Sequence, residues 1–285
     1  SPLDETSIIG FGIGLAHNGF IPIPEIQFLA YLHNAEDQLR GEAATLPFFS
    51  EGRFTNPMVL RVPGLAYQKG FGGHFHNDNS LTIFRDIPGL ILAVPSNGAD
   101  AVRMLRTAVR EAYYNGRIVV FIEPIALYMT KDLFNAKDGK WAFEYPEIKE
   151  EIPIGEFKTY GNGNTLTIIT YGNGLYLSLQ AQKEIEKKIK KKIKVIDLRW
   201  LSSINIQGLL DSIRNCKNVL IVDECRRTGC HGENIFYQLK TLSDKEIKIK
   251  LHAAEDSFIP LGVAATATLP SKDSIIENSM AMINE

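Results

Sequence analysis

Short, continuously apolar segments that alternate with helical patterns constrain the fold of this chain more than any other feature. Residues 89–96 (GLILAVPS) and 117–124 (RIVVFIEP) are apolar runs, and the amphipathic segment between them stops at Gly116. A helix over residues 31–44 and a strand from Pro57 are also predicted. Strands buried on both faces carry such unbroken apolar runs because helices cover both sides of a parallel sheet. The pattern therefore predicts an α/β fold.

The same rhythm returns in the second half of the chain. Further strands are predicted at residues 165–172, 194–200, 218–224 and 247–254. Between the two series, residues 131–150 become polar and aromatic, which is typical of a connector that crosses a surface. We therefore expect two domains, residues 1–150 and residues 151–285, each a mostly parallel sheet flanked by helices.

Composition and charge narrow the class of protein. The 285 residues are 45% hydrophobic and 22% charged, which is enough apolar material for one large or two medium domains. A net charge of −2 disfavours general binding to nucleic acid or to membrane surfaces. No apolar run approaches the roughly 20 residues of a membrane helix. The start SPLDETSIIG lacks an initiator Met and the layout of a signal peptide, so we expect a processed or truncated piece.

Three cysteines fit a reducing compartment, because an odd number gives no complete set of disulfides. Cys225 and Cys230 do not form a CxxC pair, and the adjacent His231 has no second histidine at ligand spacing. A metal site at these residues is therefore disfavoured.

Lysines crowd between residues 187 and 194. Three isoleucines recur there at every fourth position, Ile185, Ile189 and Ile193. One apolar stripe then faces the domain while the lysines are solvated. A patch that binds nucleic acid is the alternative, and the solvated face is the favoured interpretation.

A glycine-rich segment near the start raises the question of a dinucleotide site. Gly10, Gly12 and Gly14 form a GxGxG pattern, whereas the dinucleotide fingerprint is GxGxxG after a strand. Close helix packing, in which glycine lets two backbones approach, is the favoured interpretation.

Residues 68–80 (QKGFGGHFHNDNS) form a second glycine-rich segment, with His74 and His76 in it. Glycine-rich loops with histidine are typical of active-site edges. A mobile surface loop and a metal pair made by the two histidines are alternatives, and residue chemistry alone leaves all three open.

Motifs along nearly the whole chain match one family in the same order. They lie in residues 1–32 (SPL-x-E, a glycine-rich helix and EIQF-x-x-Y), 76–90 (the histidine loop to PGL), 195–205 (VIDLRWLSSIN), 219–235 (VLIVDECRRTGCHGENI) and 255–262 (EDSFIPLG). Together they resemble the beta subunit of the branched-chain 2-oxo acid and pyruvate dehydrogenase decarboxylating components. The family's patterns are TP-[IL]-x-E, EIQF-x-x-Y, a histidine loop before PGL, VIDLRTIxPxD and a glycine-rich GGxGxEI segment.

The resemblance implies a transketolase-like pyrimidine-binding domain followed by a transketolase C-terminal-like domain. It implies the beta-type half of a thiamine diphosphate-dependent 2-oxo acid dehydrogenase, which decarboxylates a 2-oxo acid oxidatively and passes the acyl group to lipoyl groups. The family binds the diphosphate and Mg²⁺ through a GDG…N motif on an alpha-type subunit or domain, and this chain has no such motif. A fused alpha–beta enzyme cut at this point is one explanation.

The implied partners are that alpha-type subunit or domain, a second beta-type chain and a lipoyl acyltransferase core. Neither nucleic acid nor a membrane is an expected partner. The isolated chain should be inactive because half of the cofactor site belongs to the partner. The implied location is the bacterial cytoplasm, or the mitochondrial matrix in a eukaryote.

Glu5 falls on the family's glutamate that hydrogen-bonds N1′ of the aminopyrimidine. Protonation at N1′ favours the 4′-imino form, which removes the C2 proton, and a carboxyl group in apolar surroundings can share the N1′ proton. The alternative is a helix cap, because residues 4–7 (DETS) also favour capping.

Four further positions match functional positions of the family. Tyr31 falls on the aromatic residue that stacks on the aminopyrimidine ring, and Leu3 and Gln27 fall on other cofactor contacts. His76 matches the histidine that handles the 2-oxo acid adduct and its transfer to lipoyl groups. A histidine suits that work because it exchanges protons near neutral pH.

The chain departs from the family pattern at three places, one of which is the extra residues in 111–124 (EAYYNGRIVVFIEP). Residues 77–79 are Asn-Asp-Asn where the family has Ser-Gln-Ser, and His74 is additional, so substrate preference can differ. Asn56, Met58 and Val59 replace the usual residues of a structural potassium loop, which leaves potassium binding open.

Two alternative functions stay open. A fragment of a transketolase or of a deoxyxylulose-phosphate synthase shares the domain order, and a non-catalytic scaffold subunit would support an active homologue. The histidine loop and the EIQF-x-x-Y match favour the dehydrogenase. The sequence leaves the identity of the 2-oxo acid and the oligomeric state open.

Overall fold

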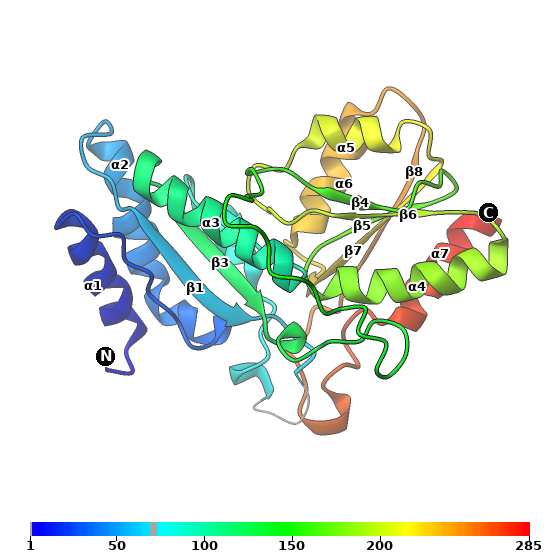
Figure 1. Cartoon of the computed structure of the whole chain (residues 1–285), viewed down its shortest axis with the longest axis horizontal. Helices are drawn as coiled ribbons and strands as arrows, with labels where there is room; N and C mark the ends of the chain where they lie inside the picture. Colours follow the sequence, from blue (N-terminus) through cyan, green and yellow to red (C-terminus); the bar gives the residue numbers. More distant parts are fainter. Residues whose placement is uncertain (1, 69–72) are drawn as a thin grey trace.

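The computed structural model describes residues 2–68 and 73–285. Ser1 and residues 69–72 lie outside the described part, so the first half of the predicted histidine loop is largely without a described structure. The described chain contains two sheets, one in each half of the sequence (Figure 1).

The first sheet has three parallel strands in the order β1-β3-β2. The strands are β1 (Met58–Gly64), β2 (Ile91–Ala93) and β3 (Ile118–Pro124). Alternate residues of β3 enter different clusters: Val119 packs toward helix α3 (Gly98–Asn115), and Val120 packs on the opposite face. Both faces of the sheet are covered, as the unbroken apolar runs predict.

Helix α3 ends at Gly116, as the sequence predicts. The Asn97 side chain at the N-cap accepts the backbone N–H of Asp100 at 2.9 Å. Gly116 at the C-terminal end has a φ of 62°, a left-handed conformation that glycine adopts at little cost.

The opposite face of the first sheet is covered by the N-terminal helical segments. These are α1 (Glu5–His17), the 3₁₀ segment η1 (Leu29–Ala35), the π-helix η2 (Gln38–Ala44) and α2 (Thr45–Phe49). The sequence predicted one helix over residues 31–44, whereas the structure has a 3₁₀ segment followed by a π-helix. In a 3₁₀ helix, side chains three residues apart share one face, and Leu29 and Leu32 are accordingly both buried.

The second sheet has five strands in the order β4-β6-β5-β7-β8. The strands are β4 (Lys158–Tyr160), β5 (Thr167–Thr170), β6 (Lys194–Asp197), β7 (Asn218–Arg226) and β8 (Lys248–Ala254). Only the edge strand β4 is antiparallel among the pairings of the described strands. The prediction of mostly parallel sheets is confirmed.

Four helices cover this sheet. The helices are α4 (Asn173–Ile189), α5 (Ile206–Ile213), α6 (His231–Leu242) and α7 (Lys272–Asn284). Residues of α4 and α7 share one apolar cluster with Ile168 of β5, whereas α5 and α6 pack with Ile169 on the other face. The predicted apolar stripe is confirmed, because Ile185 and Ile193 are fully buried and Ile189 packs beside them.

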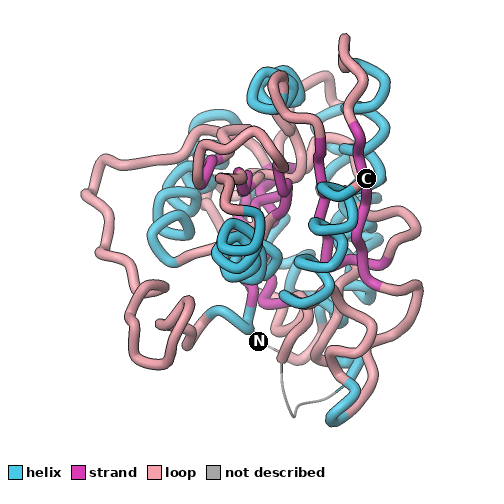
Figure 2. Tube along the Cα trace, turned by 90° about the vertical axis from the view of Figure 1, so that its right-hand side faces the viewer, coloured by secondary structure: helices cyan, strands magenta, loops and turns pink. Residues whose placement is uncertain are grey.

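Loops and short 3₁₀ turns connect these elements. The turns are η3 (Gly73–Phe75), η4 (Leu81–Asp86), η5 (Ile125–Leu127) and η6 (Gly262–Ala264). Residues 131–150 contain neither helix nor strand, as expected of a connector, and loops of this kind run along the outside of the fold in Figure 2. Arg106 fastens the connector to α3 by donating to the carbonyl of Glu150 at 3.1 Å.

The two halves share buried contacts. Ser96 Oγ donates to Asp197 Oδ1 at 2.8 Å, and the buried Arg199 forms an ion pair with Asp100 at 2.8 Å. One apolar cluster also contains residues of both sheets. The described helices include none that is long and apolar enough to cross a membrane.

Candidate active site

Glu5 is the first residue of α1, and its side chain is buried, with 6% of its surface exposed. The preceding Asp4 accepts hydrogen bonds from the hydroxyl groups of Thr6, at 2.6 Å, and Ser7. Asp4 therefore engages the polar side chains at the helix start, and Glu5 turns inward. The helix-cap alternative does not explain the burial of Glu5.

The buried carboxylate of Glu5 has little hydrogen bonding from the chain itself. Asn34 of η1 donates through Nδ2 to Glu5 Oε2 at 3.5 Å, the long limit of a hydrogen bond. Across the described ranges, this is the one hydrogen bond that the Glu5 side chain makes. A buried carboxylate needs strong donors to offset its lost hydration. Glu5 thus has acceptor capacity for a donor that the chain does not supply.

Tyr31 and His76 meet although they lie 45 residues apart in the sequence. The Tyr31 hydroxyl lies 3.2 Å from Nε2 of His76, within hydrogen-bond distance. Phe28 packs edge-on against both rings, with centroids 5.6 Å from Tyr31 and 4.6 Å from His76. Tyr31 and His76 are half-buried, so the three rings form a partly open aromatic wall.

A second contact joins the same two segments. His33 Nε2 lies 3.3 Å from Asp78 Oδ2, and Ser80 Oγ donates to Asp78 Oδ1 at 2.7 Å. The hydrogen bond to Asp78 raises the pKa of His33. Burial acts to raise the pKa of Asp78, but the hydrogen bonds from His33 and Ser80 outweigh it and hold that pKa below its ordinary value. Both partners are thus biased toward their charged forms.

The segment after His76 is also tied to the second domain. Asn79 Nδ2 donates to the carbonyl of Glu224 in β7 at 2.7 Å, and Arg226 donates to Asn79 Oδ1 at 3.1 Å. Burial raises the pKa of Glu224 to about 8, although Asn173 Nδ2 donates to both of its carboxylate oxygens. The position of the histidine segment therefore depends on the second domain.

Two predicted cofactor contacts do not join this cluster. The Leu3 side chain is 80% exposed, and Gln27 is exposed as well. His74 is exposed too and stacks near Phe75, with ring centroids 4.2 Å apart. The structure thus brings together Tyr31 and His76, and it buries Glu5 beneath Asn34 of the same η1 segment.

Phe28, His33 and Asn34 were missed by reasoning from the sequence. Phe28 and Tyr31 are three residues apart in EIQF-x-x-Y, the spacing that a 3₁₀ turn places on one face. That spacing was the available signal for Phe28. No comparable signal marked His33 or Asn34.

An apolar groove of about 810 Å³ borders α1 next to this site, and the 71% exposed Phe11 lies in it. The close glycine packing expected for α1 is found only at Gly12, where an added methyl group would lie 3.5 Å from Pro24 Cγ. An added methyl at Gly10 or Gly14 would meet no atom within 4 Å. The expectation is therefore wrong within this chain for those two glycines, which lie on an uncovered face.

No group of three or more His, Cys, Asp or Glu residues within residues 2–68 and 73–285 is arranged to hold a metal ion. Cys225 and Cys230 are buried free thiols. At the expected potassium loop, Asn56 Nδ2 donates to the carbonyl of Ala43 at 2.9 Å, and Met58 and Val59 are fully buried.

Comparison with known proteins identifies related families and a related fold. The profile of the transketolase pyrimidine-binding domain matches residues 1–130, and that of the transketolase C-terminal domain matches residues 155–275. The pyruvate dehydrogenase E1 component subunit beta of Staphylococcus epidermidis is 31% identical over 290 residues, covering 99% of this chain and 82% of the relative. Its counterpart from Staphylococcus aureus is 31% identical over 286 residues, with 98% and 81% covered.

A solved structure has the same architecture. A split-gene transketolase, described as an inactive beta4 tetramer, matches with a TM-score of 0.74 over 98% of this chain and 81% of that chain. The sequence identity is 17%, so this likeness speaks for the fold alone.

Proposed function

The chain belongs to the family of the beta subunits of the pyruvate dehydrogenase E1 component, and on that basis we propose that it is the beta-type half of a thiamine diphosphate-dependent 2-oxo acid dehydrogenase. With an alpha-type partner, it decarboxylates a 2-oxo acid oxidatively and passes the acyl group to a lipoyl group. Residues 1–150 bind the aminopyrimidine, and residues 151–285 serve assembly.

The buried Glu5 carboxylate is the observation that carries this proposal. Its one hydrogen bond from the described chain is the 3.5 Å contact from Asn34 Nδ2. The carboxylate can therefore accept a further hydrogen bond from a protonated nitrogen of a ligand. Thiamine diphosphate, when bound, supplies the carbon nucleophile for decarboxylation. Glu5, buried at the start of α1, shares the proton at N1′ of the aminopyrimidine. Tyr31 adds an aromatic surface, and Leu3 and Gln27 add contacts when the partner is present.

His76 is the second proposed catalytic residue. It donates a proton to the lipoyl sulfur that leaves as the disulfide opens, while the other sulfur takes the acyl group. The contact between the Tyr31 hydroxyl and Nε2 of His76, 3.2 Å long, orients the imidazole for this transfer. The His33–Asp78 contact fixes the same two segments relative to each other.

The partners follow from what this chain lacks. The alpha-type subunit or domain supplies the diphosphate site and Mg²⁺, a second beta-type chain completes the pairing, and a lipoyl acyltransferase core receives the acyl group. The apolar groove beside α1 supports this assembly, because a partner that covers it also closes over the helix that Glu5 begins. We assign no potassium site; Asn56 Nδ2 donates to Ala43, and Asn56 Oδ1 is buried without a hydrogen-bond partner in the described chain. The proposed location is the bacterial cytoplasm or the mitochondrial matrix.

Reconstitution of the chain with its alpha-type partner tests the function. Thiamine diphosphate, Mg²⁺, lipoamide and either pyruvate or a branched-chain 2-oxo acid are supplied, and CO₂ and acyl-lipoamide are measured. We expect both products only when both subunits are present, with the beta-type chain alone inactive.

Two other outcomes would replace this function. Ketol transfer between sugar phosphates without lipoamide acylation would identify a transketolase-type enzyme. A calorimetric titration of the reconstituted complex that shows no thiamine diphosphate binding would identify a scaffold subunit.

A further inference from the structure

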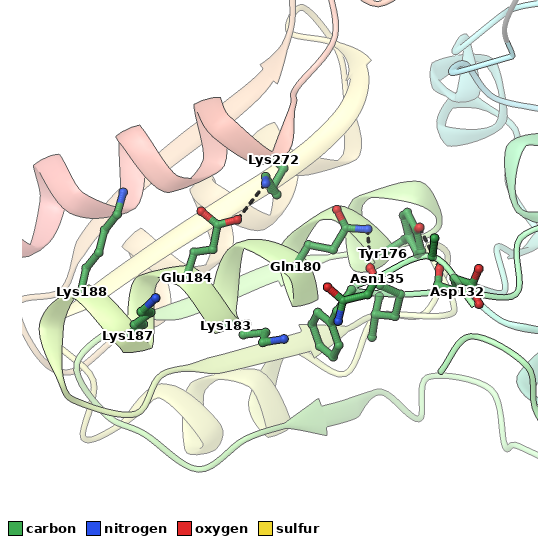
Figure 3. A pocket seen from close by; sticks show the side chains of 12 residues that line it. Asp132, Asn135, Tyr176, Gln180, Lys183, Glu184, Lys187, Lys188 and Lys272 are labelled. Carbon is green, nitrogen blue, oxygen red and sulfur yellow. Dashed lines mark hydrogen bonds and ion pairs between the residues drawn. The ribbon is translucent and has the colours of Figure 1, made fainter. Parts of the chain in front are cut away.

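A second groove, of about 770 Å³, lies in the C-terminal half and shares no residue with the candidate active site. Connector residues 132–136, helix α4 and the start of α7 line it (Figure 3). The lysines among its lining residues are Lys183, Lys187 and Lys188 of α4 and Lys272 of α7. The protein as a whole carries a net charge of −2, so this positive surface is a local concentration.

The acidic side chains that line this lysine groove are already engaged. Glu184 accepts a hydrogen bond from Lys272 Nζ at 2.7 Å, drawn as a dashed line in Figure 3. Asp132 accepts the backbone N–H groups of Lys137 at 2.7 Å and Gly139 at 2.8 Å. Glu184 also attracts Lys187 and Lys188, but the four lysines of the groove outnumber its two carboxylates.

The three lysines of α4 are exposed and take part in none of the ion pairs of the described residues. Lys187 follows Lys183 by four residues, which is about one helical turn, and Lys188 is the next residue. Figure 3 shows them spread along α4, with Lys187 and Lys188 farther from the connector than Lys183. Like charges at this spacing repel, and a bound anionic group relieves that repulsion.

The connector wall of the groove carries both apolar and polar side chains and is fixed in place. Gln180 Nε2 donates to the carbonyl of Leu133 at 2.8 Å, and the Tyr176 hydroxyl donates to the carbonyl of Asp132 at 2.9 Å. These bonds hold the connector, including Phe134, against α4. The groove therefore exists before any ligand arrives, which lowers the entropic cost of binding.

The aromatic ring in the wall disfavours nucleic acid. Proteins that bind single strands stack bases on open aromatic faces. Here Lys183 Nζ lies over the Phe134 ring, 4.4 Å from its centroid, and Lys140 Nζ lies 5.4 Å from the same centroid. The ammonium groups occupy the face of the Phe134 ring, so a base cannot stack on that face. The edge of the ring can still contact an apolar side chain.

We propose that the lysine groove binds an acidic segment of a protein partner, one in which carboxylates alternate with apolar side chains. The carboxylates pair with Lys183, Lys187 and Lys188, and the apolar side chains lie against Phe134. An extended segment matches lysines spread along a helix better than a compact anion does. The site is independent of Glu5, Tyr31 and His76, so it stands or falls separately from the proposed dehydrogenase function.

Fluorescence anisotropy of a labelled peptide of alternating glutamate and leucine tests the site on the full chain. We expect saturable binding that weakens as salt is raised, because salt screens exposed charges. The triple variant Lys183→Gln, Lys187→Gln, Lys188→Gln should weaken binding by about tenfold. Phe134→Ala should weaken it without changing the charge, and circular dichroism checks that both variants are folded.

A matched triple variant separates this groove from general charge attraction. Lys149→Gln, Lys217→Gln and Lys240→Gln remove the same charge at exposed lysines outside the groove and should leave binding unchanged. Equal weakening by both triple variants, or no saturable binding, would overturn the proposal. Tighter, lysine-dependent binding of a single-stranded oligonucleotide would overturn it in favour of a nucleic-acid site.

Discussion

Two pairs of side chains join η1 to the segment that follows η3, and the partners in both pairs have the same separation along the sequence. Tyr31 meets His76 and His33 meets Asp78, and in both pairs the partners are 45 residues apart in the sequence. The backbone of each segment is therefore held at two points, two residues apart. A link at two points restricts rotation of one segment against the other, which is the freedom that would separate Tyr31 from His76.

The His33–Asp78 pair should stabilise the protein only while His33 is protonated. The pKa of His33 is raised by Asp78, so its contribution is full below the ordinary histidine pKa and is lost as pH rises through the raised value. A double-mutant cycle with His33→Gln and Asp78→Asn, measured by urea unfolding, should give a coupling of about 0.2–1 kcal/mol at about pH 5.5. Glu36 and Arg226 act on His33 in opposite directions and remain in every variant.

The coupling should decline toward zero as pH rises to about 9. A coupling free energy that stays constant over this range would show that the pair acts as a neutral hydrogen bond.

The sequence predicted the residue types of the site better than their contacts. Glu5, Tyr31 and His76 could be selected from ordered motifs. The His33–Asp78 contact could not, because it depends on a 3₁₀ segment where the sequence predicted one continuous helix. Side chains two residues apart point in different directions in the two helix types.

Among the strands, those with apolar runs were predictable, whereas the short edge strand β4 was not. Strand β3 has six buried residues out of seven, whereas β4 has no buried residue and forms an exposed antiparallel edge. An edge strand of this kind carries no apolar run for a sequence pattern to detect. The antiparallel strand β4 was accordingly missed, while β1, β3 and β7 were predicted.

Two glycine substitutions in helices should change stability in opposite directions. A methyl group added at Gly10 of α1 meets no atom within 4 Å, so Gly10→Ala should raise the free energy of unfolding by about 0.5–1 kcal/mol through helix propensity. A methyl group added at Gly174 of α4 would lie 2.0 Å from Thr170 Oγ1. Gly174→Ala should therefore lower stability by about 1–3 kcal/mol.

Urea unfolding of the two single variants measures both effects in the isolated chain. A loss of stability in Gly10→Ala would mean that α1 packs more closely on the rest of the chain than its uncovered face indicates.

At the scale of the whole molecule, the two domains meet through buried acidic groups. Ser96 donates to Asp197 across the interface, and Asn79 donates to the backbone carbonyl of Glu224. Burial raises the pKa of Asp197 to about 7 and that of Glu224 to about 8. The folded state therefore holds protons near neutral pH that the unfolded chain would release.

The contribution of these two carboxyl groups to stability should fall as pH rises from about 4 toward about 8, because the unfolded chain binds fewer protons at them than the folded chain does. His231 acts in the opposite direction below its ordinary pKa, since burial lowers its pKa to about 3, so the carboxyl contribution is measured as a difference between variants. Glu224→Gln keeps a neutral group of similar size and should give a shallower dependence in urea unfolding. A slope that matches the unsubstituted protein would show that Glu224 is already ionised in the folded state.

The central claim is that this chain completes a thiamine diphosphate enzyme and that Glu5 activates the cofactor. The direct measurement is 2-oxo acid decarboxylation by the complex with the alpha-type partner, comparing Glu5→Gln with Glu42→Gln, an exposed glutamate of the same domain. Glu5→Gln should lose about 100-fold or more in rate while calorimetry still detects assembly and cofactor binding, and Glu42→Gln should retain its activity. Near-full activity of the Glu5→Gln complex would contradict the claim.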